Sequence, residues 1–209
     1  MLGIKDFYVF LAASLLLNIT PGTDMLYIIT RSTSQGRRAG IVSALGIGSG
    51  SLVHMTAAAL GLSAIFLYSA LAYEILKWFG VAYLLYLGIR TLLKKESTLQ
   101  VRELREESLW KVYRQGVLVN ILNPKVALFF LAFLPQFIDP GTSHATLQIL
   151  FLGGFFNLGG TIINIGVAIL FGYLGVRFIQ HIWVARIQKW LTGSVFLGLG
   201  LNLALSKRQ

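Results

Sequence analysis

The sequence contains no cysteine, and this absence excludes several classes of protein at once. Without thiols there is no disulfide framework, no thiolate metal site and no cysteine redox centre. Charged residues are also scarce: they form 12% of the 209 residues, against 56% hydrophobic residues and a mean hydropathy of +0.72. Ordinary soluble domains carry about 25% charged residues, so the composition is not that of a soluble domain.

Acidic residues are rarer still, eight against 18 basic ones, and the formal net charge is +10. In a soluble protein this excess would suggest a nucleic-acid partner. Here the basic residues lie between long apolar runs, where they set the topology of a membrane protein. We therefore expect no nucleic acid as a partner, and a lipid bilayer as the surroundings. The N-terminal apolar run lacks a small-residue cleavage site, so it is predicted to be a retained span and not a signal peptide.

Six apolar segments are long enough to cross a bilayer. They cover residues 5–30, 40–67, 70–93, 113–138, 146–175 and 184–205. The sequence thus predicts an all-α membrane protein with one transmembrane domain, 1–209. Its halves, about 1–95 and 113–209, are joined by a charged cytoplasmic loop, 94–112, which we expect to hold a short solvated helix.

The basic residues also predict the orientation. Thirteen of them lie in the first, third and fifth loops or their flanks, and four lie on the opposite side. Both termini are therefore expected outside the cytoplasm.

A faint internal repeat relates the third segment to the sixth. An offset of 112 places Lys77-Trp78 on Lys189-Trp190, Leu85 on Leu197, and Leu87-Gly88 on Leu199-Gly200. Halves of three spans each enter the membrane in opposite orientations, which gives the inverted repeat of many secondary transporters. We predict a 3+3 inverted repeat.

The first segment is interrupted at Pro21 and Gly22. Residues Phe7 to Ile19 form only about 20 Å of helix, too short for a hydrocarbon core of about 30 Å, so the span must continue through the break. Asp24 then lies within the membrane or at its edge. Ionisable groups there are costly and indicate a pathway or a buried partner.

A second proline, Pro124, interrupts the fourth segment. Pro21 stands 10 residues before Arg31, and Pro124 stands 10 residues after Arg114. If both arginines mark the inner surface, both breaks lie roughly 15 Å inside it. Broken helices at such a depth are the best sequence indication of a transport site.

The residues around the two breaks suit a zwitterion. Asp24 can bind an ammonium or exchange a proton, and Lys125 can receive a carboxylate or pair with Asp24. Neutral hydrogen-bonding groups complete the set: Asn18, Thr20, Asn120 and Asn123. The alternatives are an Asp24–Lys125 ion pair that only joins two helices, and a pair that opens as substrate enters.

Other polar residues allow more than one interpretation. Asn157, Thr161 and Asn164 share a face of the fifth segment, and they either line the pathway or bond between helices. Gly46, Gly48 and Gly50, with Ser49 and Ser51, favour close helix packing. His54 follows Ser51 by three residues, but hydrolase spacing is missing and a packed histidine is favoured over a catalytic one.

Four stretches resemble the LysE/RhtB amino-acid exporters over the whole length of the chain. They are Thr20-Pro21-Gly22-Thr23-Asp24-Met25, Gln35-Gly36-Arg37-Arg38-Ala39-Gly40, Ala82-Tyr83-Leu84-Leu85-Tyr86-Leu87-Gly88, and the run from Asn123-Pro124-Lys125 to Phe137. Thr23 replaces a proline usual in the first motif of the family, which loosens one dihedral constraint on the break.

The resemblance implies export of amino acids or close derivatives from the cytoplasm across a bacterial inner membrane, driven by the proton-motive force. Neutral cargoes such as threonine, homoserine and its lactone, or leucine are expected ahead of basic ones, with no cofactor, no metal and no enzymatic activity. A monomer and a homodimer both stay open. The alternatives are a passive small-solute channel and a structural membrane protein.

Overall fold

The computed structural model describes residues 4, 6–68, 70–93, 105–138, 144–174 and 182–205. Every regular element in these ranges is helical. The elements are α1 (Phe7–Ile19), α2 (Thr23–Gln35), α3 (Arg37–Tyr68), α4 (Ala70–Leu93), α5 (Leu109–Ile121), α6 (Pro124–Leu128), a π-helical turn η1 (Phe129–Phe133), a 3-10 turn η2 (Leu134–Phe137), α7 (Ala145–Leu174) and α8 (Ile182–Leu205). The all-α class is confirmed.

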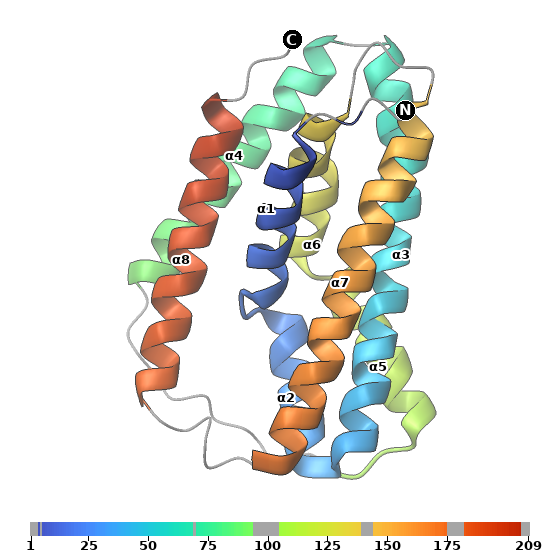
Figure 1. The fold of residues 1–209 in the computed structure, drawn as a ribbon, viewed down its shortest axis with the longest axis vertical. Helices are drawn as coiled ribbons and strands as arrows, with labels where there is room; N and C mark the ends of the chain where they lie inside the picture. The colour runs from blue at the N-terminus through green and yellow to red at the C-terminus, as the bar shows by residue number, and fades with distance from the viewer. Residues whose placement is uncertain are drawn as a thin grey trace.

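Two helices, α3 and α7, are individually long and apolar enough to cross a membrane. Up to four spans result if α1 with α2 and α5 with residues 124–137 each count as one bent span. Helix length and composition in the described residues therefore do not confirm the six-span arrangement predicted from the sequence. The helices lie roughly along the long axis of the molecule, as expected for a bundle in a bilayer (Figure 1).

Both predicted breaks are present. The chain bends by 46° between α1 and α2 and by 48° between α5 and α6. Gly22 precedes α2 in an extended conformation, and Asn123 precedes α6 with its side-chain Oδ1 accepting from the Lys125 amide at 3.0 Å. Proline at the first position of α6 needs no amide partner, so Pro124 ends one helix and starts the next.

The structure moves two boundaries predicted from the sequence. The first expected segment ends at residue 30, but α2 continues to Gln35, so Arg31 lies inside a helix, 3% exposed, and does not mark a loop. Gly36, with φ of +84°, then allows the tight turn into α3. Of the loop 94–112, residues 94–104 lie outside the described residues; residues 105–108 are non-helical and 109–112 open α5.

Glycines bring α3 against α5. A Cβ at Gly46 would stand 2.3 Å from the Tyr113 carbonyl oxygen, and one at Gly116 would stand 2.8 Å from the Ser43 carbonyl oxygen. These approaches require glycine, because real Cβ atoms do not come so close. The packing role expected for Gly46 is therefore confirmed. On its other side, α3 runs along α7 in the opposite direction (Figure 1).

The contact between α4 and α8 is reciprocal. A Cβ at Gly88 would stand 2.7 Å from Leu197 Cγ, and one at Gly200 would stand 3.1 Å from Leu85 Cδ2. The predicted offset of 112 exchanges these two contacts, since it relates Leu85 to Leu197 and Gly88 to Gly200. The two helices run in opposite directions along each other (Figure 1).

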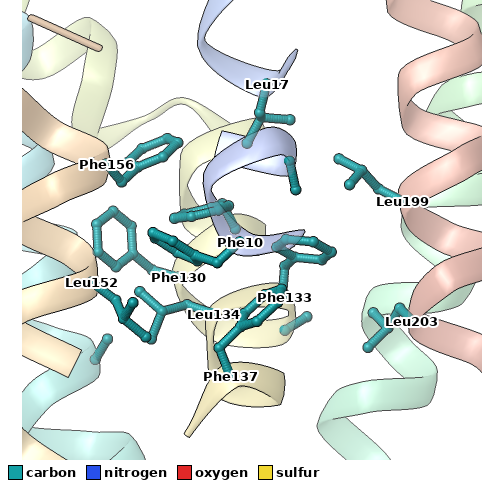
Figure 2. Close-up of a cluster of buried hydrophobic side chains, with 14 of the residues drawn as sticks. Phe10, Leu17, Phe130, Phe133, Leu134, Phe137, Leu152, Phe156, Leu199 and Leu203 are labelled. Atoms are coloured by element: carbon teal, nitrogen blue, oxygen red, sulfur yellow. The ribbon is translucent and has the colours of Figure 1, made fainter. Parts of the chain in front are cut away.

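An aromatic cluster fills the space between α1, the η1–η2 turns and α7 (Figure 2). Phe129 stacks on Phe156 with ring centroids 3.9 Å apart, and Phe10 meets Phe137 edge-on at 5.3 Å. Leu199 and Leu203 of α8 contribute from the other side (Figure 2). Phe156 also lines the polar cavity described next, so the cluster borders that cavity.

Candidate substrate site between two broken helices

The first break exposes backbone carbonyls that Lys125 binds. Pro21 has no amide hydrogen to donate to the Leu17 carbonyl, its usual partner one turn earlier. Lys125 Nζ takes that place, at 3.1 Å from the Leu17 oxygen and 2.9 Å from the Thr20 oxygen. The ammonium thus sits at the C-terminal end of α1, where the helix dipole favours positive charge.

Asn120, which lies just before the second break, forms a hydrogen bond with Asp24. Asn120 Nδ2 donates to Asp24 Oδ2 at 2.8 Å, and both side chains are buried, 2% and 7% exposed. Asp24 lies in the first turn of α2, where unpaired amides and the helix dipole favour a carboxylate. The polar tip of α5 and the start of α2 are therefore joined at the level of the breaks.

Between the breaks lies a polar cavity. It is lined by Asn18, Thr20, Asp24, Met25, Ile47, Gly48, Ser51, Asn120, Lys125, Val126, Phe156, Asn157, Gly160, Thr161 and Asn164. Its volume is about 30 Å³, room for one or two water molecules. An amino acid does not fit without movement of the surrounding helices.

Three buried oxygen atoms at this cavity have no hydrogen-bond partner in the described part of the chain: Asp24 Oδ1, Asn120 Oδ1 and Ser51 Oγ. Buried polar atoms are normally paired, because leaving one unpaired costs about 1–3 kcal/mol. A group of unpaired acceptors beside a cavity therefore indicates that something else, water or a ligand, donates to them.

The structure brings most of the predicted site residues together. Asn18, Thr20, Asp24, Asn120, Lys125, Asn157, Thr161 and Asn164 all line the cavity. Asn123 does not; it caps α6 instead. Pro21, Gly22 and Pro124 stand at the breaks.

Asp24 and Lys125 are not joined by an ion pair in the ranges that the structure describes. Each has another partner: Lys125 binds backbone carbonyls, and Asp24 binds an amide. The direct pair considered from the sequence is thus not the arrangement in this structure, although both residues border one cavity.

Sequence reasoning assigned Ser51 and Gly48 to packing and did not place Gly160 at the site. A Cβ at Gly48 would stand 2.7 Å from Thr161 Oγ1, and one at Gly160 would stand 2.8 Å from Asn18 Oδ1, so both glycines admit polar side chains. The Asn18 side chain in turn donates to the Phe156 carbonyl at 3.1 Å. A signal was available, since Gly48 and Ser51 are three residues apart and share one helix face.

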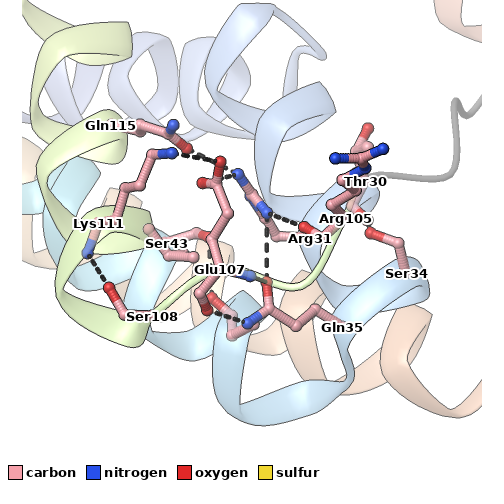
Figure 3. Close-up of polar contacts among 12 residues, drawn as sticks. Thr30, Arg31, Ser34, Gln35, Ser43, Arg105, Glu107, Ser108, Lys111 and Gln115 are labelled. Carbon is pink, nitrogen blue, oxygen red and sulfur yellow. Dashed lines mark hydrogen bonds and ion pairs between the residues drawn. The ribbon is translucent and has the colours of Figure 1, made fainter.

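A second polar group lies at the end of the molecule where α2 ends and α5 begins (Figure 3). Arg31 Nη2 binds Glu107 Oε2 at 2.6 Å and Gln115 Oε1 at 2.7 Å, while Nη1 reaches Gln35 Oε1 at 3.2 Å. Lys111 also pairs with Glu107, at 2.8 Å. We call these five residues the Arg31 network; it joins α2 to α5 and to the residues before α5.

Apolar helices, two bent helix pairs and a polar cavity between the bends are the features expected of a multi-pass membrane transporter. The comparisons agree. The LysE type translocator family matches residues 15–207. The chain belongs to this family of membrane translocators.

Its relatives cover its whole length. It is 31% identical to an uncharacterized membrane protein of Vibrio cholerae, over 99% of this chain and 100% of the relative. It is 31% identical to the homoserine/homoserine lactone efflux protein of Salmonella typhimurium and 30% identical to the protein of the same name from Salmonella typhi, over 96% of each chain. No solved structure matches the chain.

Proposed function

We propose that this protein exports small amino acids or their derivatives, of the homoserine, threonine or homoserine lactone type, by proton antiport. The observation that carries the proposal is the set of unpaired oxygens at a cavity between two broken helices. The relatives named as homoserine/homoserine lactone efflux proteins support the substrate class.

The substrate ammonium would bind the three unpaired oxygens. An ammonium carries three hydrogen-bond donors, and Asp24 Oδ1, Asn120 Oδ1 and Ser51 Oγ are three acceptors that no described residue satisfies. One of them belongs to a carboxylate, so the contact is charge-assisted. The same carboxylate would carry the coupling proton when the substrate is absent.

The carboxylate of an amino acid would meet Lys125. In this structure Lys125 is occupied by the Leu17 and Thr20 carbonyls, so it must release at least one of them to bind a carboxylate. Its double role, closing the first break and then receiving substrate, would couple binding to movement of α1. A lactone has no carboxylate and makes no such demand. Asn18, Thr20, Asn157, Thr161 and Asn164 would complete the lining, and Asn123 would hold the start of α6.

A cavity of about 30 Å³ is too small for these substrates, so the surrounding helices would have to move apart for a substrate to bind. Alternating access would rock one half of a six-span, 3+3 inverted repeat against the other. The antiparallel run of α3 along α7 and the reciprocal contacts of α4 and α8 support this arrangement.

In a bacterial inner membrane the Arg31 network would lie at the cytoplasmic side and both termini at the periplasmic side. A homodimer is compatible with one complete site per chain.

Counterflow in proteoliposomes tests the proposal. Purified protein is reconstituted, and uptake of labelled homoserine or homoserine lactone is measured with and without an imposed pH gradient. We expect saturable exchange that the gradient accelerates. Flux that ignores the gradient and never saturates would indicate a passive channel, and no flux in wild-type protein would indicate a structural membrane protein.

The native absence of cysteine makes the topology test direct. A single cysteine at Ser34 or at Glu74 can be labelled with a membrane-impermeant maleimide on intact spheroplasts and on inverted vesicles. We expect position 34 to react from the cytoplasmic side and position 74 from the periplasmic side. The reverse pattern would contradict the proposed orientation.

A further inference from the structure

Each proline in the breaks deprives one carbonyl of its helical donor, and the structure replaces both donors in the same way. Pro21 leaves the Leu17 carbonyl free, and Lys125 binds it. Pro124 has no amide to donate to the Asn120 carbonyl, and His54 Nε2 lies 3.0 Å from that oxygen. A carbonyl oxygen only accepts, so Nε2 must carry the hydrogen.

The two replacements cross between the halves of the chain. His54 belongs to α3 in the N-terminal half and contacts a carbonyl at the break in the C-terminal half. Lys125 belongs to the C-terminal half and binds a carbonyl at the break in the N-terminal half. His54 does not line the cavity, so it makes no contact with the proposed substrate position. Its ring lies nearly parallel to that of Phe130, with centroids 6.3 Å apart, which fixes its orientation.

His54 contacts Asn120, and Asn120 is the residue that hydrogen-bonds to Asp24. The Asn120 side chain donates to Asp24 Oδ2, while its own Oδ1 is one of the unpaired oxygens at the cavity. The Asn120 carbonyl also accepts from the Asn123 amide at 2.9 Å, so loss of the histidine leaves one donor in place. The break is therefore expected to survive the loss, with Asn120 less firmly placed.

We propose that His54 is a positioning residue for transport: its Nε2–H replaces the amide missing at Pro124 and fixes Asn120, and through Asn120 the Asp24 carboxylate. The inference rests on the proposed function for the role of Asp24. It differs from both a catalytic histidine and a histidine that merely fills space, because it depends on one hydrogen-bond donor.

Three variants separate these roles. His54→Leu keeps an apolar side chain without a donor, His54→Gln keeps a donor of similar reach, and Thr56→Ala is the matched control on α3, where the threonine bonds only to its own helix at Leu52. We expect His54→Leu to raise the KM for counterflow at least about fivefold, because it loses one hydrogen bond worth about 1 kcal/mol or more. His54→Gln should stay within about twofold of wild type, and Thr56→Ala should equal it.

A suppressor variant provides a second measurement that does not depend on transport. Pro124→Ala restores an amide at the break, so His54→Leu/Pro124→Ala should regain thermal stability relative to His54→Leu alone, whereas a space-filling role predicts no such recovery. Wild-type KM in His54→Leu, or equal loss in His54→Gln and His54→Leu, would overturn the inference alone. Absence of transport in wild-type protein would overturn the proposed function, and the role of His54 in transport with it.

Discussion

The two buried cations of this protein, Arg31 and Lys125, have opposite surroundings. Arg31 binds a carboxylate and two side-chain amides within 3.2 Å (Figure 3), although its buried Nε has no hydrogen-bond partner among the described residues. Lys125 binds two backbone carbonyls and borders a cavity where three buried oxygens have no hydrogen-bond partner among the residues that the structure describes. One cation is neutralised by an acid in contact, and the other is not.

This difference separates a cation that has a carboxylate partner from a cation that lies beside unpaired hydrogen-bond acceptors. A matched, hydrogen-bonded ion pair joins two elements, and its two charges already satisfy each other without a ligand. Buried acceptors without a donor cost free energy, and a ligand that donates hydrogen bonds to them offsets that cost. The unpaired oxygens that gather at the cavity, more than the presence of charge, are the reason to propose a binding site there.

The largest expected difference is between variants of the two carboxylates, Asp24 at the cavity and Glu107 in the Arg31 network. Asp24→Asn should lower export by about 10- to 100-fold, because the ammonium loses a charge-assisted contact worth about 1.5–3 kcal/mol. Glu107→Gln should change export per folded molecule by less than about threefold. Both are measured as counterflow normalised to folded protein. Equal losses in the two variants would erase the distinction between the regions.

The cations themselves come next. Lys125→Met leaves the Leu17 and Thr20 carbonyls without their donor within the membrane, so we expect a loss of thermal stability and about a tenfold loss of amino-acid export. Homoserine lactone should be affected less, since it has no carboxylate to lose a partner. Arg31→Gln keeps an amide donor and should lower stability while export per folded molecule stays within about threefold. Equal sensitivity of lactone and amino acid would contradict a carboxylate contact at Lys125.

Two serines on α3 sharpen the comparison at smaller scale. Ser51 Oγ has no partner at the cavity in the described part of the chain, whereas Ser49 accepts from the Tyr113 hydroxyl at 2.7 Å and donates to its own helix. Ser51→Ala should raise the KM about three- to tenfold, and Ser49→Ala should leave it unchanged. A loss of activity in Ser49→Ala alone would reopen the possibility of an enzyme built on that serine.

The smallest effect concerns pH and the Arg31 network. The hydrogen bond from Lys111, opposed by partial desolvation and aided by the Arg31 charge, holds the pKa of Glu107 below its ordinary value of 4.5. The folded state thus binds this proton less readily than the unfolded state. The stability contributed by the lowered pKa is present above pH 4.5 and is lost as the pH falls through the folded-state value.

Thermal unfolding in detergent between pH 7 and pH 4 measures this effect. The stability difference between wild type and Glu107→Gln should shrink as the pH falls below about 4.5, where the carboxylate is protonated first in the unfolded state and, at lower pH, in the folded state. Lys111→Met, which removes the foremost cause of the pKa shift, should move this loss toward higher pH. A difference independent of pH would show that the carboxylate charge does not contribute.

The breaks, and most of the site around them, could be predicted from the sequence. A proline in an apolar run bends a helix whatever surrounds it, and the fixed thickness of a bilayer sets the length that each span must reach. Asn18, Thr20, Asp24, Asn120 and Lys125 follow because they neighbour the prolines along the chain. The position of Arg31 within a helix could not be predicted, because a charge at the end of an apolar run indicates a loop and its partner Glu107 lies 76 residues away along the chain.

The sequence by itself determined that this chain is helical, belongs in a membrane and breaks twice at proline, because these properties depend on composition and on neighbours along the chain. Only the tertiary structure decided which donor meets which freed carbonyl. His54 and Asn120 are 66 residues apart, and Lys125 and Leu17 are 108 apart. The glycines of α3 and α7 set how closely the helices approach, and that approach decides which polar atoms are paired and which stay unpaired in the described ranges.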